Sequence, residues 1–193
     1  MKILQIIHGY PPQYNAGSEV YTQSICNELS KYHQVTVFSR EENPYIPDFT
    51  VRYEKQTESL DFYFINMAQG KDGFRHSELD KKFAELIIKV RPDVAHVGHL
   101  NHLSTGIIDE LSKHHIPIIF TLHDFWLMCP RGQFLQRNTD GRNIWQLCDK
   151  QENHTCATVC YKPLHSGHIP SFDRMLAQEY THKVPHGMDT LND

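Results

Sequence analysis

The chain has 193 residues and a net charge of −4 with its 14 histidines counted as neutral. A chain of this length can bury a substantial core, and its acidic balance provides no basic field, so we exclude nucleic acid as a partner. No apolar run approaches the roughly 20 residues of a membrane-spanning helix, and the N-terminus does not resemble a secretory signal. We therefore expect a cytoplasmic protein with reduced thiols, which contacts the inner face of a membrane only peripherally, through a partner or substrate.

Short apolar runs alternate with segments of helical period as far as about residue 131. The opening run, 3–7, has the length of a buried strand, and Ser18 is the expected N-cap of the helix that follows. The other expected elements are strands at 34–39, 93–97 and 116–122, a hairpin of 50–53 with 62–65, and helices at 77–90 and 103–113. Strands that alternate with helices of about 10–15 residues are typical of βαβ units. The sequence therefore predicts an α/β fold: a Rossmann-like open, mostly parallel sheet with helices on both faces.

The periodicity fades from about residue 131 onward. We expect one domain over 1–181, with an irregular excursion at 131–170, a helix at 171–180 and a frayed tail at 182–193. Cys148, Cys156 and Cys160 lie in the excursion with the spacing C-x7-C-x3-C. That spacing differs from the paired C-x2-C of common structural zinc sites. A zinc site remains the alternative, but the spacing favours three thiols without a metal.

The loop after the first strand contains Gly17 and Ser18 at the start of a helix. In an open parallel sheet, ligands bind beyond the carboxyl ends of the strands. A helix start adds unpaired N–H groups and a partial positive charge, which suit a phosphate or carboxylate. The Gly-x-Gly-x-x-Gly fingerprint is absent, which argues against NAD or FAD, and there is no Walker A lysine. The alternative is an ordinary connection that binds nothing.

Three stretches go beyond a generic α/β domain: PP with AGSE at 11–19, RPDVAHV at 91–97, and TLHDFWLMCPRG at 121–132. In order and spacing they resemble the N-terminal domain of the family 4 glycosyltransferases, retaining enzymes with the GT-B fold. In that fold two Rossmann-like domains face each other across a cleft. The resemblance covers residues 1 to about 135 well, and the last of the three stretches is the most specific.

The resemblance implies the residues of a site. His123 corresponds to the family histidine near the transferred sugar and is the expected catalytic residue, orienting and stabilising the reacting groups. Gly17 faces the donor diphosphate or the acceptor, and Gly98 replaces a histidine that is common in relatives. The expected donor- or acceptor-binding residues are Gly17, Ser18, Glu19, His99, Asp124 and Arg131. The alternatives are that His123 is a structural residue at a strand end, and that Glu19 only complements the helix dipole.

The resemblance also implies the substrates and partners. It implies a nucleotide-diphosphate sugar as co-substrate, no metal or other cofactor, and a glycan, lipid-linked or small-molecule acceptor in cell-envelope polysaccharide biosynthesis. The family's C-terminal domain, which grips the nucleotide sugar, has no counterpart in these residues. We therefore expect the acceptor-side half of a hexosyltransferase, inactive alone, with a C-terminal donor-binding domain or subunit as its partner. The alternative is a non-catalytic regulatory or assembly subunit that kept the fold and lost the chemistry.

Overall fold

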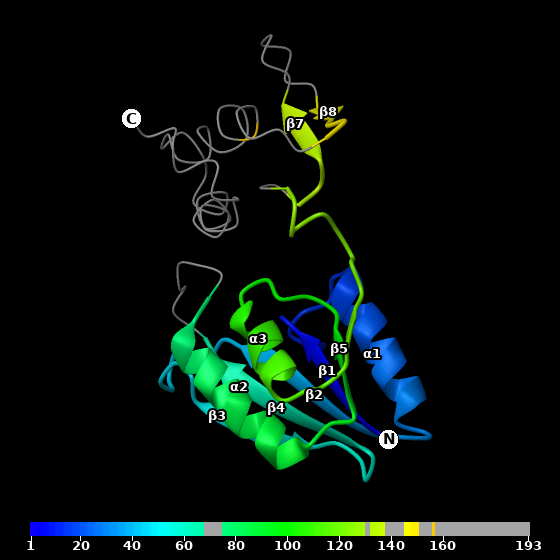
Figure 1. The fold of residues 1–193 in the computed structure, drawn as a ribbon, viewed down its shortest axis with the longest axis vertical. Coiled ribbons are helices and arrows are strands. Elements are labelled where there is room, and N and C mark those ends of the chain that lie inside the picture. Colours follow the sequence, from blue (N-terminus) through cyan, green and yellow to red (C-terminus); the bar gives the residue numbers. More distant parts are fainter. Residues whose placement is uncertain (68–74, 130–131, 138–144, 151–155, 157–193) are drawn as a thin grey trace. The chain divides into compact units, whose positions relative to one another are not determined.

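The computed structural model describes residues 1–67, 75–129, 132–137, 145–150 and 156. The chain divides into two compact units between His123 and Asp124, and each unit is described by itself. The first unit contains a six-stranded sheet and the helices α1, α2 and α3 (Figure 1). Whether 1–181 forms one domain stays a prediction, because most residues beyond 150 lie outside the described part.

The elements of the first unit follow one another as strands and helices in alternation, apart from one hairpin. In chain order they are β1 (Lys2–Ile7), α1 (Gly17–Leu29), β2 (Gln34–Glu41), β3 (Val51–Lys55), β4 (Leu60–Asn66), α2 (Ser77–Val90), β5 (Val94–Val97), α3 (Gly106–Lys113) and β6 (Ile118–Phe120). Helix α2 ends where Arg91 adopts a left-handed conformation, with φ of 52°, directly before Pro92. A proline cannot continue the helix, which explains the position of this end.

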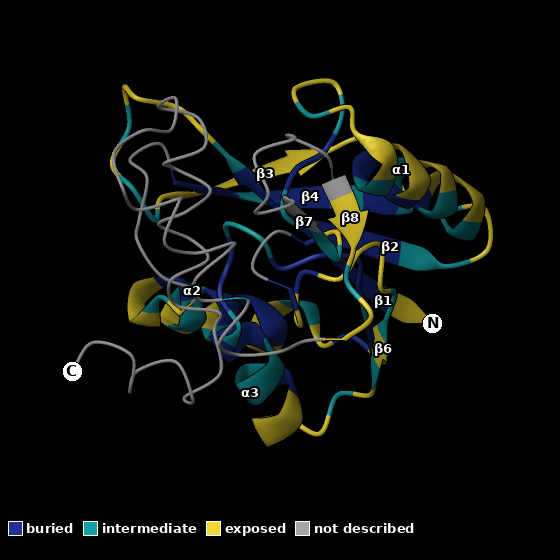
Figure 2. Cartoon of the chain, turned by 90° about the horizontal axis from the view of Figure 1, so that it is seen from above, coloured by how far each residue is buried: buried dark blue, intermediate teal, exposed yellow. Residues whose placement is uncertain are grey.

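The order of the strands in the sheet is β3-β4-β2-β1-β5-β6. All neighbours are parallel except β3, which runs antiparallel to β4 as the hairpin prediction requires. The chain moves from β1 to β2 on one side and later returns to β5 on the other side. Because parallel crossovers are right-handed, this reversal places α1 on one face and α2 with α3 on the other, as Figure 2 shows. The prediction of a mostly parallel Rossmann-like sheet is confirmed.

The core lies on both faces of the two central strands. On the face of α1, Cys26 packs with Ile7, Val37 and Phe62. On the opposite face the ring of Phe83 from α2 meets the ring of Phe38 from β2, with centroids 5.1 Å apart. Because both faces of the sheet are covered, β1 and β2 are almost continuously buried along their length, including polar residues such as Gln5 and Thr36 (Figure 2).

Three local expectations were wrong. Ser18 does not cap α1: the N-cap is Ala16, and the Ser18 hydroxyl donates to the Glu19 carboxylate instead. Helix α3 begins three residues later than expected, because the Ser104 hydroxyl accepts the N–H of Gly106 at 3.1 Å and keeps the preceding turn outside the helix. The strand expected at 116–122 is a three-residue edge strand that is not buried, and Ile119 is 57% exposed.

The second unit contains a small hairpin of β7 (Leu135–Arg137) and β8 (Trp145–Leu147), which are antiparallel. The sequence pattern did not predict this hairpin within the irregular excursion. The expected helix at 171–180, the tail at 182–193 and Cys160 lie outside the described residues. None of the helices in the described part of the chain is long and apolar enough to span a bilayer.

The contact between Phe83 of α2 and Phe38 of β2 should contribute to the stability of the fold. Replacing Phe83, which is fully buried, by alanine leaves a cavity beside Phe38, and we expect a loss of about 3–5 kcal/mol in the free energy of unfolding. Urea denaturation of the purified chain measures this loss. Ile88→Ala is the matched control in the same helix, since Ile88 is 58% exposed and its removal should cost less than about 0.5 kcal/mol. Equal losses in the two variants would contradict the packing described here.

Candidate functional site

The carboxyl ends of β1 and β5 meet where the order of the strands reverses. In an open α/β sheet this is the place where a crevice for a ligand forms. His8 is the first residue after β1, and residues 98–102 follow β5. The start of α1 returns to the same edge, because its third residue, Glu19, contacts His8.

His8 and Glu19 form a partly buried pair. The Nε2 atom of His8 lies 2.9 Å from Oε1 of Glu19, and Glu19 is only 3% exposed. The Ser18 hydroxyl donates to the second carboxylate oxygen at 3.0 Å. Both oxygens of Glu19 therefore have a partner, which is what a buried carboxylate requires.

Burial and hydrogen bonding together set the protonation states of Glu19 and His8. Burial by itself raises the pKa of the Glu19 carboxyl, but hydrogen bonds from His8, from its own backbone N–H and from Ser18 outweigh burial and lower the pKa to about 2. Burial also lowers the pKa of His8 despite the hydrogen bond to Glu19, and His99 and His102 lower it further. Glu19 is thus ionised and His8 neutral near pH 7. An ionised carboxylate only accepts hydrogen bonds, so the proton of His8 is on Nε2.

The tautomer of His8 leaves its second nitrogen as an acceptor. Nδ1 of His8 is buried and has no hydrogen-bond partner among the described residues. A buried acceptor without a partner costs about 1–3 kcal/mol. The site therefore keeps an imidazole lone pair in a fixed orientation, which is the property needed to accept a hydrogen bond from a hydroxyl or ammonium group.

The loop after β5 brings two further imidazoles to His8. The rings of His8 and His99 lie edge to face with centroids 4.8 Å apart, and the ring of His102 is 6.4 Å from that of His8. The backbone N–H of Asn101 donates to Nδ1 of His99 at 2.9 Å, so a neutral His99 has its proton on Nε2. His102 adopts a left-handed conformation with φ of 56°, which is uncommon for a residue other than glycine. We call His8, His99 and His102 the histidine group.

Gly98 explains how this loop approaches β1 so closely. A Cβ atom at this position would lie 3.1 Å from Cδ1 of Ile7 and 3.3 Å from Oγ1 of Thr22. A larger residue, including a histidine, would push against β1 and α1. Position 98 therefore has no room for an imidazole, and the histidines of this loop are His99 and His102.

His123 lies at the end of the first unit, three residues after β6. Its ring packs edge to face on the ring of Tyr21 from α1, with centroids 5.0 Å apart. His96 on the adjacent strand lies 2.7 Å from the Thr121 hydroxyl through Nε2. Burial lowers the pKa of His96, and His123 lowers it further. His123 itself is exposed, so it can reach a ligand without a change in the core.

The other predicted site residues divide into three cases. Glu19 and His99 come together through His8, whereas Gly17 is the exposed first residue of α1, with no atom within 4 Å of its Cβ position. Asp124 belongs to the second unit, where its Oδ1 accepts the N–H of Trp126 at 2.8 Å. Arg131 lies outside the described residues. None of these positions tests a role in binding, so the roles stay predictions.

Sequence reasoning missed His8, His102 and Tyr21. The sequence did contain a signal for His8, because it directly follows an apolar strand. The same kind of position, three residues after β6, had drawn attention to His123. His102 shares a loop with His99 and had the same signal. Tyr21 carried no signal, since an aromatic residue on a helix is usually part of the core, and only the structure places it against His123.

Metal ligands do not gather in the part of the chain that the structure describes: no three His, Cys, Asp or Glu side chains come close enough to share an ion. Cys129, Cys148 and Cys156 form no disulfide within that part of the chain. Cys160 is outside the described residues, so the zinc alternative for the excursion remains untested.

Comparison with known protein families places most of the chain in one of them. The family described as Glycosyltransferase Family 4 matches residues 15–161 of the chain, which include α1, the loop after β5, β6 and His123. No curated protein matches the chain.

The pair of His8 and Glu19 predicts a stability that depends on pH. The folded-state pKa of Glu19, about 2, is below its ordinary value of 4.5. The pair therefore stabilises the fold above pH 4.5 and loses this contribution as the pH falls from 4.5 toward 2. Glu19→Gln should lower the free energy of unfolding at pH 7 by an amount on the order of 2–3 kcal/mol, and the gap to the wild type should narrow below pH 4.5. Urea denaturation from pH 7 to 3.5 measures it.

The control for this prediction is Glu28→Gln in the same helix. Glu28 pairs with Lys31 in solvent, and an exposed pair contributes less than about 1 kcal/mol. A gap for Glu19→Gln that stays constant from pH 7 to 3.5 would show that the fold does not lower the pKa of Glu19.

Proposed function

The chain belongs to glycosyltransferase family 4, and we propose that it forms the acceptor-side half of a retaining transferase that uses a nucleotide-sugar donor. The observation that carries this proposal is the meeting of the histidine group, the start of α1 and His123 around one edge of the sheet. Glu19 of α1 contacts His8, and Tyr21 of the same helix contacts His123. Short polar loops at this edge are the usual place for a ligand in such a fold.

In this proposal the imidazoles position hydroxyl groups. The new bond joins an acceptor oxygen to the anomeric carbon of the donor sugar, while the bond from that carbon to the leaving diphosphate breaks. The acceptor proton passes to the leaving diphosphate, so the protein needs no separate base. His123 donates a hydrogen bond to a sugar or acceptor hydroxyl, and the start of α1, which has no side-chain cap, faces the diphosphate or the acceptor.

We propose that a C-terminal domain or a separate subunit grips the nucleotide of the donor, as in the two-domain arrangement of the family. The acceptor is then a glycan or a lipid-linked saccharide, and no metal takes part. We place the protein in the cytoplasm, in peripheral contact with the inner face of the membrane when the acceptor is lipid-linked. Transfer should require both halves, because interactions made only in the closed transition state contribute to the rate.

His123 is the first residue to test. We expect His123→Ala to lower the turnover of the complete enzyme by ~10²-fold or more, the size of removing one well-placed catalytic group. The melting temperature should change little, because His123 is exposed and its ring contacts Tyr21 at the surface. Transfer of labelled sugar and thermal unfolding measure the two quantities.

The matched control is His114→Ala, an exposed histidine directly after α3. It should leave turnover unchanged. If His123→Ala unfolds the protein while activity per folded molecule stays normal, His123 is structural and this proposal loses its catalytic residue.

Gly17 tests whether α1 approaches a ligand. The Cβ position of Gly17 is in open space, so Gly17→Val should leave the fold intact. Transfer by the complete enzyme should nevertheless fall steeply, and Gly17→Ala should fall between Gly17→Val and the wild type, because the side chain would block a ligand close to the backbone. Full activity in Gly17→Val would show that the loop is only a connection.

A further inference from the structure

A cleft of the first unit lies apart from the histidine group. This cleft has a volume of about 840 Å³, within the range of about 300–1,000 Å³ typical of ligand sites. Its walls come from residues 10–14 after β1, Gln23 of α1, residues 40–45 at the end of β2, one face of β3 with Gln56 after it, and two phenylalanines of β4. None of the histidines and none of the residues 17–19 line it.

The topology of the sheet explains why the cleft is open. Helix α1 packs over β1, β2 and the start of β4, where Phe62 joins its core. The strand β3 is added at the edge, with Arg52 opposite Phe64 and Glu54 opposite Phe62 in the register. Arg52, Glu54 and Phe64 lie toward the edge of the sheet, where α1 contributes only Gln23 to the lining of the cleft. Polar groups of β3 therefore form one wall of a hollow whose floor is aromatic.

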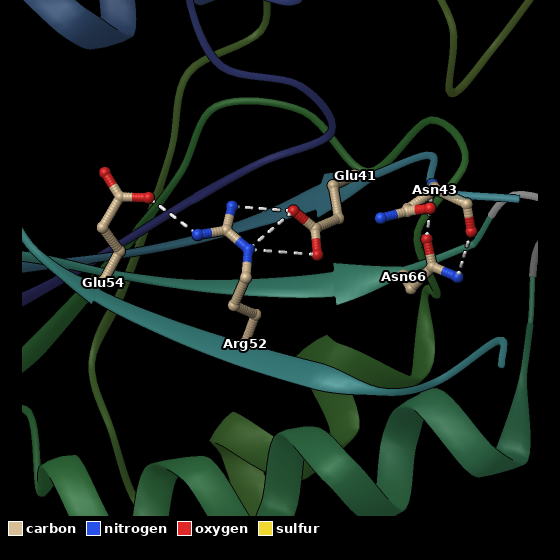
Figure 3. Close-up of polar contacts among 5 residues, drawn as sticks. All are labelled: Glu41, Asn43, Arg52, Glu54 and Asn66. Carbon is tan, nitrogen blue, oxygen red and sulfur yellow. Dashed lines mark hydrogen bonds and ion pairs between the residues drawn. The ribbon is translucent and has the colours of Figure 1, made fainter. Parts of the chain in front are cut away.

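The charged groups of the cleft are paired with one another. Arg52 donates to Glu41 at 3.0 and 2.7 Å and to Glu54 at 2.7 Å, and Figure 3 shows its guanidinium between the two carboxylates. Arg40 pairs with Glu42 at 2.9 Å. Two arginines and three glutamates line the cleft, which gives it a formal charge of 2 − 3 = −1. The net charge of the cleft would repel a diphosphate, and both of its arginines are already paired with glutamates. The cleft therefore does not suit the donor's phosphates.

The inner end of the cleft is rigid. Arg40 is only 8% exposed, and its guanidinium lies 5.5 Å from the centroid of the Tyr14 ring. Its Nε donor has no hydrogen-bond partner among the described residues. A buried arginine held by an aromatic ring and a carboxylate loses little freedom on binding, which favours affinity.

Paired ions beside aromatic rings match the chemistry of a neutral sugar. A sugar hydroxyl both donates and accepts, and adjacent guanidinium and carboxylate groups offer the two complementary roles. The C–H faces of a pyranose ring are apolar and pack on aromatic rings. Tyr45, which is 93% exposed at the rim, offers such a ring. We propose that the cleft binds an uncharged saccharide unit of the acceptor. The binding of a sugar is independent of the proposed function, but its assignment to the acceptor rests on that function.

The experiment uses saturation-transfer difference NMR on the full 193-residue chain. The probes are the methyl glycosides of glucose, galactose, mannose and N-acetylglucosamine, with UDP as a phosphate-bearing comparison. We expect saturation of at least one methyl glycoside. Tyr45→Ala and Glu42→Gln should weaken its binding by at least ~5-fold, the size of losing one aromatic contact or one charged hydrogen bond. Both residues are exposed, so neither change should unfold the chain.

The matched control is Tyr32→Ala, which removes a tyrosine that is 80% exposed outside the cleft and should leave the sugar signal unchanged. Absence of signal from all four glycosides would overturn the proposal. So would a signal that survives both cleft variants, or a stronger effect of the cleft variants on UDP than on the sugars.

The two proposals fail separately. His123→Ala should lower transfer by ~10²-fold or more but keep sugar binding in the cleft. Transfer by the complete enzyme without sugar binding by the cleft would refute only the cleft. Sugar binding without any transfer by the complete enzyme would refute only the proposed function.

Discussion

The parallel pairing of β1 with a neighbour on each side is the constraint on which the rest of the first unit depends. β1 pairs with β2 through one edge and with β5 through the other. Because crossovers keep one hand, these two pairings send α1 to one face and α2 with α3 to the other. They also direct His8 and the loop of His99 to the same edge. The apolar burial of β1 and the meeting of the histidines therefore have the same origin.

Electrostatics separates the two polar regions of this unit. The histidine group is built around a buried carboxylate, Glu19, which accepts a hydrogen bond from Nε2 of His8 and so fixes its tautomer, whereas burial lowers the pKa of His8 and keeps it neutral. In the histidine group, each contact of His8 and His99 uses one ring nitrogen in a fixed orientation. The cleft near β3 instead contains arginines and glutamates that neutralise one another. The histidine group is suited to orienting one reacting group, whereas the cleft is suited to an uncharged ligand with several hydroxyl groups.

Local patterns predicted much of this architecture. The run 3–7 and the helical period of 77–90 correspond closely to β1 and α2, because both elements bury a regular apolar face. Boundaries set by single side chains were less predictable. Ser18 is a residue type that often caps helices, but its hydroxyl donates to the Glu19 carboxylate instead. The start of α3 likewise depends on a single side chain, because the Ser104 hydroxyl accepts the N–H of Gly106. The edge position of β6 was not visible either, since an apolar run does not reveal whether a second neighbour exists.

The sequence by itself determined the class of the fold, the family, the positions of His99 and His123 after strands and that of Gly17 at the start of a helix, because periodicity and motif spacing are properties of neighbouring residues. Only the tertiary structure decided that Glu19 pairs with His8, that Tyr21 packs on His123, and that Arg52 of β3 reaches Glu41 of β2 over the intervening strand β4. Each of these contacts joins residues from different elements. Their partners depend on strand order, register and burial, which the spacing of residues along the chain does not encode locally.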